Sequence, residues 1–268
     1  MTELRALIFD VDGTLAETER DGHRVAFNRA FAEAGLDWEW SVERYGHLLG
    51  TAGGKERLQR YLQEDHPEFV PVPDATTWAA TLHKAKTRHY KTLVQEGIMP
   101  LRLGVKRLIQ EAREQGVKLA IATTSAPENV VALLETNLAA DSPNWFEVIA
   151  AGDMVPAKKP APDVYLYALA ELGVPPAACL AIEDSRQGLL AATQAGLKTV
   201  VTRSHYTQEE DFREAVLVLD HLGEPEAPLP AIAGHPICST YFDLALAAEL
   251  VNLPHPFPPP APHPSFLS

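Results

Sequence analysis

The feature that most constrains the fold is the segment of residues 5–16, which reads Arg-Ala-Leu-Ile-Phe-Asp-Val-Asp-Gly-Thr-Leu-Ala. Its apolar run, Ala6 to Phe9, predicts a short buried strand of a parallel sheet. Asp10 and Asp12 follow directly. If the chain stays extended, both carboxylates point to the same side and repel each other unless a cation or a proton lies between them. Open α/β sheets bind ligands beyond the carboxyl ends of their strands, so this segment is either a ligand site or an ordinary acidic turn.

After about residue 101 the chain alternates between apolar strands and amphipathic helices. Strands are predicted at 117–122, 146–151, 179–182, 197–202 and 216–219, and helices at 105–115, 127–138, 161–172 and 186–195. Strands that alternate with helices of about 10–15 residues indicate an α/β fold with a doubly wound parallel sheet, a Rossmann-like core. The first strand, at residues 6–9, belongs to the same sheet.

The stretch between the first strand and this alternating part reads as helical throughout. Helices are predicted at about 19–34, 41–49, 54–64 and 74–95. The economical topology is a small helical cap (residues 17–96) inserted after the first strand of a catalytic core (residues 1–16 and 97–228). Residues 229–268 form a C-terminal extension with one short helix at 240–250. Seven prolines within residues 254–264 predict an extended or disordered end, with a Pro-rich recognition peptide as the alternative.

Composition limits the possible partners and the compartment. The chain has 268 residues with a net charge of −13, which argues against a nucleic-acid partner but not against a small anionic substrate. No apolar run approaches the roughly 20 residues that span a bilayer, so no membrane partner is expected. Cys179 and Cys238 are the only cysteines, and the former lies in a predicted buried strand. Because a disulfide framework is unexpected and the first strand comes too early for a signal or transit peptide, we expect a cytoplasmic protein, most simply a monomer.

Polar side chains follow each placed core strand, and they differ in kind. The groups are Asp10 and Asp12, Thr123-Thr124-Ser125, Lys158-Lys159-Pro160, and Glu183-Asp184-Ser185. In a parallel sheet these ends lie at one edge. Three or four carboxylates at that edge require a hard divalent cation with oxygen ligands, for which Mg²⁺ is the natural candidate. Lys159 and Thr123 remain to hold a phosphate, so the set predicts phosphoryl transfer.

These segments resemble the four motifs of the haloacid-dehalogenase-like phosphohydrolases. The matching residues are Asp10-Val-Asp12-Gly-Thr14, Thr123, Lys159-Pro160-x-Pro162-Asp163 and Glu183-Asp184-Ser185-x-x-Gly188. The match covers about residues 4–222, and the helical stretch resembles the small cap of that superfamily. The segments Glu17-Thr18-Glu19, Gly22-His23-Arg24-Val-Ala-Phe27-Asn28 and Gly53-Gly54-Lys55-Glu56-Arg57 resemble the subgroup of rubisco-operon sugar-bisphosphate phosphatases and β-phosphoglucomutases. They are most similar to phosphatases of xylulose-1,5-bisphosphate.

The resemblance implies roles for the core residues. Asp10 is the nucleophile that forms an aspartyl-phosphate, and Asp12 is the general acid and then the base. Asp12 must then hold a proton part of the time, which neighbouring negative charge favours. Lys159, Thr123 and the main-chain N–H of Thr124 contact the phosphoryl group. The implied Mg²⁺ ligands are Asp184, Asp10, the main-chain oxygen of Asp12, and Glu183 as a second ligand or an orienter of metal-bound water. Helix capping by the acids and a solvated lysine pair at 158–159 are the alternatives.

The residues of the cap have implied roles in substrate binding. Glu17 accepts hydrogen bonds from sugar hydroxyls, and His23 reaches the substrate from the first cap helix. Lys55 and Arg57 bind a second, non-reacting phosphate, and Gly53 and Gly54 let the backbone approach it. The alternatives are an ordinary turn at the start of a helix, with solvated charges, and a surface histidine.

The resulting prediction is a Mg²⁺-dependent phosphatase of a small phosphorylated sugar, best xylulose-1,5-bisphosphate or a related sugar bisphosphate, whose cap closes over the site to exclude water. One alternative is a phosphoglucomutase-type transfer of the phosphoryl group between sugar hydroxyls. The other is a catalytically inactive binding protein on the same fold.

Overall fold

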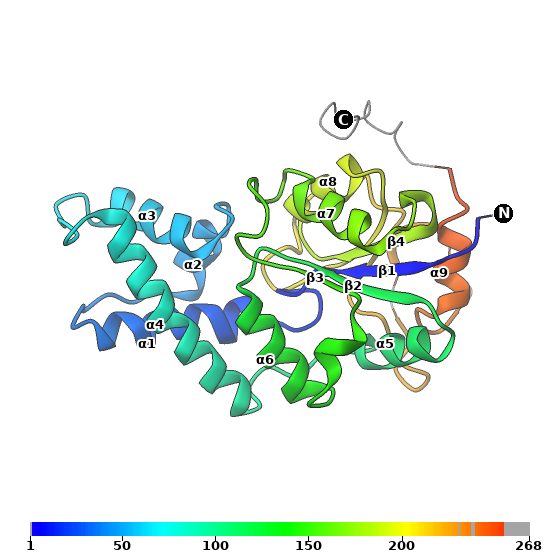
Figure 1. Ribbon diagram of the computed structural model, residues 1–268, viewed down its shortest axis with the longest axis horizontal. Helices are drawn as coiled ribbons and strands as arrows, with labels where there is room; N and C mark the ends of the chain where they lie inside the picture. The colour runs from blue at the N-terminus through cyan, green and yellow to red at the C-terminus, as the bar shows by residue number, and fades with distance from the viewer. Residues whose placement is uncertain (1, 230, 237–238, 255–268) are drawn as a thin grey trace.

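A seven-stranded sheet lies at the centre of the larger lobe in the computed structural model, which describes residues 2–229, 231–236 and 239–254 (Figure 1). The strand order is β3-β2-β1-β4-β5-β6-β7. The bounds are β1 (Ala6–Phe9), β2 (Lys118–Ala122), β3 (Val148–Ala150), β4 (Cys179–Glu183), β5 (Lys198–Thr202), β6 (Leu217–Leu219) and β7 (Ala231–Gly234). All neighbouring strands from β3 to β6 are parallel, and β7 is antiparallel to β6. The predicted doubly wound parallel sheet is confirmed.

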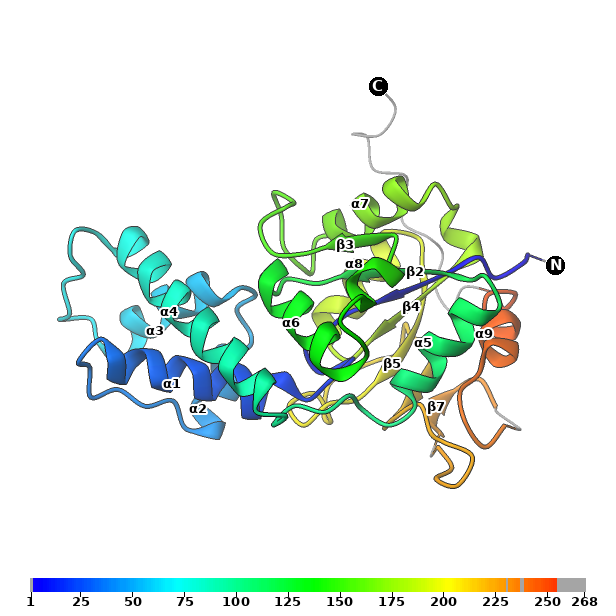
Figure 2. The same cartoon turned by 60° about the horizontal axis from the view of Figure 1, so that its bottom comes forward.

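Helices cover both faces of this sheet because successive residues of a strand point to opposite sides. Leu7 and Phe9 of β1 pack against α5 (Val105–Glu114), α6 (Pro127–Asn137) and α9 (Leu244–Leu250). Ala6 and Ile8 of the same strand pack against α7 (Asp163–Leu172) and α8 (Arg186–Gln194). Figure 2 shows α5 and α6 on one side of the strands and α7 on the other. The fully buried β1 lies between β2 and β4, which places its carboxyl end at the middle of the sheet edge.

The second lobe consists of the helices between β1 and α5, and we call residues 17–96 the helical insert. It contains a π-helical turn, η1 (Glu19–His23), followed by α1 (Arg24–Glu33), α2 (Val42–Leu48), α3 (Gly54–Asp65) and α4 (Ala75–Gln95). Its own aromatic core is separate from the hydrophobic clusters that contain residues of the sheet, and it includes Phe27, Phe31, Trp40, Tyr45 and Tyr61. Figure 1 shows the insert beyond the carboxyl end of β1. The four predicted helices agree with the structure except that the first begins with a π-helical turn. The division into core, cap and C-terminal extension stays a prediction.

Three elements of the core differ from the prediction. The short strand β7 was not predicted. The third strand spans only Val148–Ala150, since a 3₁₀ turn (Ser142–Trp145) precedes it. The helix predicted from residue 240 begins at Leu244 because the side chain of Asp243 accepts a hydrogen bond from the N–H of Leu246 and caps it. The predicted Pro-rich end falls mostly on residues 255–268, outside the described residues. None of the described helices is long and apolar enough to cross a membrane.

Trp40 is the residue on which we expect the stability of the insert to depend most. Its side chain is fully buried, with ring centroids 4.6 Å from Phe27 and 5.1 Å from Phe31. Because Trp40→Ala leaves a cavity, it should lower the free energy of unfolding by about 3–5 kcal/mol, measured by urea denaturation. The half-buried Trp78 of α4 is the control, and Trp78→Ala should cost less than half as much. Equal losses for the two variants would contradict Trp40 as the centre of this core.

Candidate active site

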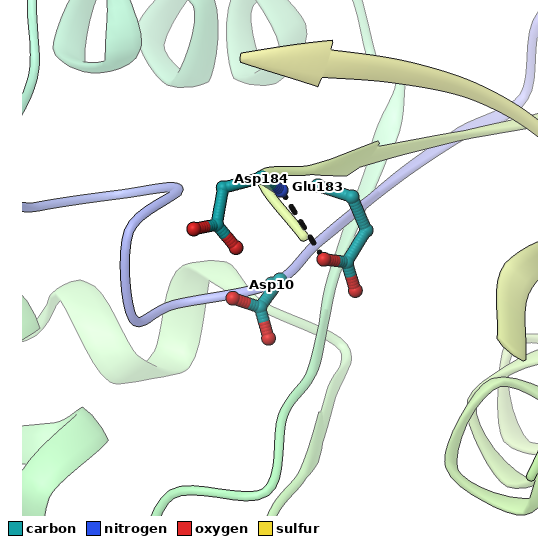
Figure 3. Close-up of side chains that lie close together, drawn as sticks. All are labelled: Asp10, Glu183 and Asp184. Atoms are coloured by element: carbon teal, nitrogen blue, oxygen red, sulfur yellow. Dashed lines mark hydrogen bonds between the residues drawn. The ribbon is translucent and has the colours of Figure 1, made fainter. Parts of the chain in front are cut away.

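The carboxyl ends of β1, β2 and β4 bring the predicted core residues to one edge of the sheet. The N–H of Asp10 donates to the carbonyl oxygen of Ile182 in β4 at 2.9 Å, which extends the β1–β4 pairing by one residue. One carboxylate oxygen each from Asp10, Glu183 and Asp184 lie within 4.8 Å of one another. Figure 3 shows the three side chains converging from β1 and β4. The sheet therefore places three buried acids together.

Lys159 joins two of these acids. Its Nζ atom donates to Asp10 Oδ1 and to Glu183 Oε1, each at 2.6 Å. Lys158 instead contacts Glu56 of the insert, at 2.8 Å, and Asp153, at 3.2 Å. The ambiguity between the two lysines is thereby removed, because the structure brings only Lys159 to Asp10.

Glu183 is fully buried and engaged by protein groups on both oxygens. Oε1 accepts from Lys159 and from the hydroxyl of Tyr165, the latter at 2.5 Å, and Oε2 accepts from the N–H of Asp184 at 3.2 Å. Gly188 makes room for this carboxylate, since a Cβ atom there would lie 2.0 Å from its carbon. The geometry thus favours Glu183 as an orienting residue over a direct metal ligand.

The acids outnumber the cations at this edge, and their pKa values reflect it. Burial raises the pKa of Asp10 to about 8; Lys159 opposes this shift, and the charges of Glu183 and Asp12 add to it. Burial, then the charges of Asp10 and Glu183, raises the pKa of Asp184 well above its usual range. Although burial lowers the pKa of Lys159, the charges of Asp10 and Glu183 hold it above its ordinary value. One ammonium group is not enough to keep three acids ionised, so the cluster favours another cation.

The donor set fits a hard divalent cation. All available ligand atoms are carboxylate or carbonyl oxygens, which Mg²⁺, Mn²⁺ and Ca²⁺ prefer. Gly13, with φ of +91°, allows the carboxylate of Asp184 to approach closely, because a Cβ atom there would lie 2.1 Å from Asp184 Oδ2. Asp10 and Asp184 would hold the ion, with the main-chain oxygen of Asp12 in the same loop.

Thr123 and Thr124 lie at the carboxyl end of β2, and both line the cleft next to Asp10. The N–H of Thr123 donates to the carbonyl oxygen of Ala150 at 3.0 Å. Its hydroxyl oxygen accepts from the N–H of Ser125 at 3.1 Å, which leaves the hydroxyl hydrogen available to a ligand. This arrangement agrees with a phosphate-binding hydroxyl.

Asp12 faces the insert, and here the structure corrects an expectation. Its Oδ1 atom lies 2.5 Å from the hydroxyl of Thr18 and 2.7 Å from His23 Nε2. Burial raises the pKa of Asp12, but the charge of His23 and the hydrogen bonds from His23 and Thr18 outweigh it and hold the pKa well below its usual range. Asp10 and Glu19 line the same cleft, but the direct contacts of His23 and Thr18 from the insert outweigh this negative charge.

His23 is a buried bridge between Asp12 and Lys86 rather than a free substrate-binding group. Its Nδ1 atom lies 2.7 Å from Lys86 Nζ in α4, and its ring stacks on Tyr90 with centroids 4.3 Å apart. With both nitrogens engaged, His23 contacts Asp12 and lines a small recess rather than the main cleft. The pattern of the long helix α4 contained no signal for Lys86.

Arg57 is the predicted insert residue that the structure places in the cleft. It is 6% exposed, and its Nη1 atom donates to the hydroxyl of Tyr45 at 2.7 Å. That hydroxyl donates in turn to the carboxylate of Glu19. The buried Nε atom of Arg57 has no hydrogen-bond partner among the described residues. Tyr45 therefore holds the guanidinium in place, and the Nε–H group could donate a hydrogen bond to a ligand.

Two other residues of the insert that were predicted to bind substrate, Lys55 and Glu17, lie away from the cleft. Lys55 pairs with Asp153 of the core, because two residues along a helix are about 200° apart and Lys55 therefore faces away from Arg57. Glu17 accepts from the N–H of His205 at 3.3 Å, and Glu19, two residues later, lines the cleft instead. The segment containing Glu17 was singled out from the sequence, but Glu19 was not assigned the role.

The cleft lies between the two lobes and encloses about 160 Å³. Gly53 and Gly54 border a smaller recess beside Asp12, His23 and Arg57. The residues lining the cleft include Asp10, Asp12, Thr123, Lys159 and Asp184 from the core, Glu19, Leu49 and Arg57 from the insert, and Ser204 and Tyr206 after β5. Its volume is below the 300–1,000 Å³ usual for drug-sized ligands, and its walls are charged, so it suits a small polar substrate.

Comparison with known proteins gives consistent results. The family model of the haloacid dehalogenase-like hydrolases matches residues 4–196. The plasmid-encoded protein CbbY of Cupriavidus necator is 50% identical over 227 residues, covering 85% of this chain and 89% of CbbY. Two crystal structures of CbbY from Rhodobacter sphaeroides, one with phosphate and one of a variant with xylulose-(1,5)bisphosphate, are 48% and 47% identical. Both have a TM-score of 0.76 and cover 82% of this chain and 95% of CbbY.

The sequence match and the structural match agree with the acids, the lysine and the threonine found at the edge of the sheet. The resemblance inferred from the four motifs is confirmed, and the alternative of an inactive binding protein is not supported. This chain belongs to the haloacid dehalogenase-like hydrolases and is a phosphatase of that family.

Proposed function

We propose that this protein is a Mg²⁺-dependent phosphatase of a sugar bisphosphate, with xylulose-1,5-bisphosphate as the best candidate. The observation that carries this proposal is one cleft with cationic groups in both lobes. Lys159 lies beside Asp10 in the core, and the buried Arg57 presents an unpaired Nε–H from the insert. A substrate with two phosphates meets a separate cation at each end. The relative crystallised with xylulose-(1,5)bisphosphate supports this substrate.

The first half of the reaction transfers the phosphoryl group to the protein. An Asp10 oxygen attacks phosphorus, the bond from phosphorus to the sugar oxygen breaks, and Asp12 gives its proton to the leaving alkoxide. Lys159 and the hydroxyl of Thr123 stabilise the charge on the phosphoryl oxygens. A bound divalent cation neutralises further negative charge when it is present.

The second half returns the protein to its starting state. Asp12 takes a proton from a water molecule whose oxygen attacks phosphorus, and inorganic phosphate leaves Asp10. The low pKa of Asp12 means that it is a carboxylate in this structure. For the first half Asp12 must carry a proton, and its contact with His23 Nε2 at 2.7 Å is one cause of its low pKa. The insert supplies this partner, so we propose that it acts as a cap whose position sets the protonation of Asp12. The cytoplasmic location and the monomeric state remain predictions.

The direct test is an assay of phosphate release from xylulose-1,5-bisphosphate in the presence of Mg²⁺. We expect hydrolysis that EDTA abolishes and added Mg²⁺ restores. Asp10→Asn removes the nucleophile and should lower kcat at least about 10³-fold. Asp141→Asn, at an exposed site just before a 3₁₀ turn, is the matched control and should keep full activity. Isomerisation of a hexose 1-phosphate without phosphate release would instead establish a mutase, and hydrolysis by Asp10→Asn would refute the mechanism.

The role of Arg57 can be separated from that of Lys55 because the two residues face opposite ways. Arg57→Met should raise KM for a sugar bisphosphate about 10–100-fold, the loss expected for a charge-assisted hydrogen bond, and change KM for a monophosphate little. Lys55→Met should leave both values within about twofold. Steady-state kinetics on a matched pair of substrates measures both. A similar rise in KM for mono- and bisphosphates would remove Arg57 from the second phosphate.

We expect Lys86 to lower the stability of the folded protein although it is needed for full activity. Burial lowers the pKa of Lys86 to about 8 from 10.5, so its charge costs about 3 kcal/mol at neutral pH. The unfolded chain binds more protons between these values, so the cost is full below pH 8 and disappears as pH rises towards 10.5. Lys86→Met should therefore raise Tm at neutral pH, with a gain that fades towards pH 10.5, and lower kcat.

The exposed Lys84 of the same helix is the control for this prediction. Lys84→Met should leave both Tm and kcat nearly unchanged. If Lys86→Met lowered Tm at neutral pH, the buried ammonium would be a net stabilising group and the prediction would be wrong.

A further inference from the structure

Arg102 lies where the chain returns from the insert to the core, between α4 and α5. Its N–H donates to the carbonyl oxygen of Leu15 at 2.8 Å, and the preceding Leu101 forms an isolated antiparallel bridge with Ala16. The two connections between the lobes are therefore joined at this point. The side chain of Arg102 is only 9% exposed.

The guanidinium of Arg102 donates to four backbone carbonyl oxygens in three segments. Nη1 donates to Gly13 and, at 2.9 Å, to Thr202, and Nη2 donates to Arg203 and Asp220, both at 2.6 Å. Gly13 follows β1, Thr202 and Arg203 lie at the end of β5, and Asp220 follows β6. A planar fork of five N–H donors can bridge acceptors in this way, whereas an ammonium group has three donors on a single atom. Arg102 thus holds three strand ends together.

Two of these segments flank Asp184. Gly13 directly follows Asp12, and a Cβ atom at Gly13 would lie 2.1 Å from Asp184 Oδ2 and 3.1 Å from the Cβ atom of Ser204. Ser204 follows Arg203, whose carbonyl oxygen Arg102 holds, and it lines the cleft. Arg102 does not line the cleft, yet it holds both the loop that contains Asp10 and Gly13 and the segment of Arg203 and Ser204 beside Asp184.

We infer that Arg102 is a positioning residue for phosphoryl transfer: it sets the loop of residues 10–13 against Asp184 by holding the Gly13 carbonyl to the ends of β5 and β6. This inference rests on the proposed function. Arg102 does not line the cleft. Its replacement should therefore disturb the alignment of Asp10 and the binding of the metal ion, and leave the affinity for substrate unchanged. The effect is then on kcat with little change in KM.

The chain offers a matched control for a purely structural arginine. Arg107, on α5, also holds backbone carbonyls, donating from Nη2 to Gly223 at 3.0 Å and to Phe242 at 2.9 Å. Its guanidinium contacts the ring of Tyr241 as well, 4.3 Å from the centroid. None of these partners lines the cleft. Arg107→Met should therefore lower Tm without changing the reaction.

The experiment compares Arg102→Met, Arg102→Lys and Arg107→Met in the full chain, at a temperature where circular dichroism shows each to be folded. Kinetics are measured with xylulose-1,5-bisphosphate and with p-nitrophenyl phosphate, and Mg²⁺ binding is measured from the rise in Tm with Mg²⁺ alone. We expect both Arg102 variants to lower kcat about 10–100-fold with KM within about threefold, and to need severalfold more Mg²⁺ for half of the Tm rise. Arg107→Met should match the wild type in kcat, KM and Mg²⁺ response.

A kcat of the Arg102 variants within twofold of Arg107→Met, or an unchanged Mg²⁺ response, would overturn the inference and leave Arg102 a structural residue. If Arg102→Met does not fold, Arg102→Lys decides, since it keeps the charge and loses only the fork. The Mg²⁺ response and p-nitrophenyl phosphate do not depend on the physiological sugar. A wild-type protein that binds Mg²⁺ and cleaves p-nitrophenyl phosphate but not the bisphosphate would refute the proposed substrate, and the comparison of variants would still test Arg102.

Discussion

The ion pairs between Lys159 and the acids at the end of β1 and β4 are the interaction on which the site depends. A buried charge is costly unless it is paired and hydrogen-bonded, and removing one partner leaves the other uncompensated. Here one ammonium group serves two carboxylates, and a third acid, Asp184, remains beside them. The surrounding structure makes this crowding possible. Gly13 and Gly188 lack the Cβ atoms that would collide with the acids, and the sheet holds their backbones in register. Because one ammonium group cannot balance three carboxylates, the same crowding favours the binding of a divalent cation.

The two acids of the first motif work in different surroundings although one residue separates them. Both carboxylates line the same cleft, which has the core on one side and the insert on the other. Asp10 therefore faces the core and Lys159, whereas Asp12 faces Thr18 and His23 of the insert. Their pKa values consequently move in opposite directions. For the proposed roles of nucleophile and proton carrier these directions must reverse, since Asp10 has to be ionised and Asp12 has to carry a proton. A bound cation would lower the pKa of Asp10 and a shift of the insert would raise that of Asp12, which makes the proposed chemistry of the core depend on the insert.

The core residues were predictable because each one lies at the end of a strand with a local apolar pattern or, for Lys159, in the segment between a strand and the next helix. Lys159 and Thr123 needed only the order of the strands to be placed beside Asp10. The insert was harder, since its site residues meet through tertiary packing. Lys86 reaches His23 across 63 residues of sequence, and no local pattern indicates that contact. Helical geometry distinguishes Lys55 from Arg57, because two residues that are two positions apart on α3 cannot both face the cleft. The start of α9 at Asp243 likewise carried a capping signal.

The net charge of −13 shows how little the overall balance says about the site. Three buried cations lie in or beside the cleft: Lys159 is held by acids, Arg57 by the hydroxyl of Tyr45, and Lys86 by His23 Nδ1. Their desolvation is a cost that a protein selected for stability alone would avoid by placing apolar residues there. Retaining them is understandable if the ligand brings negative charge of its own, because a phosphate at either end of the cleft then completes the pairing. Under the proposed function, the cations whose desolvation is costly without substrate are thus the groups that recognise its phosphates.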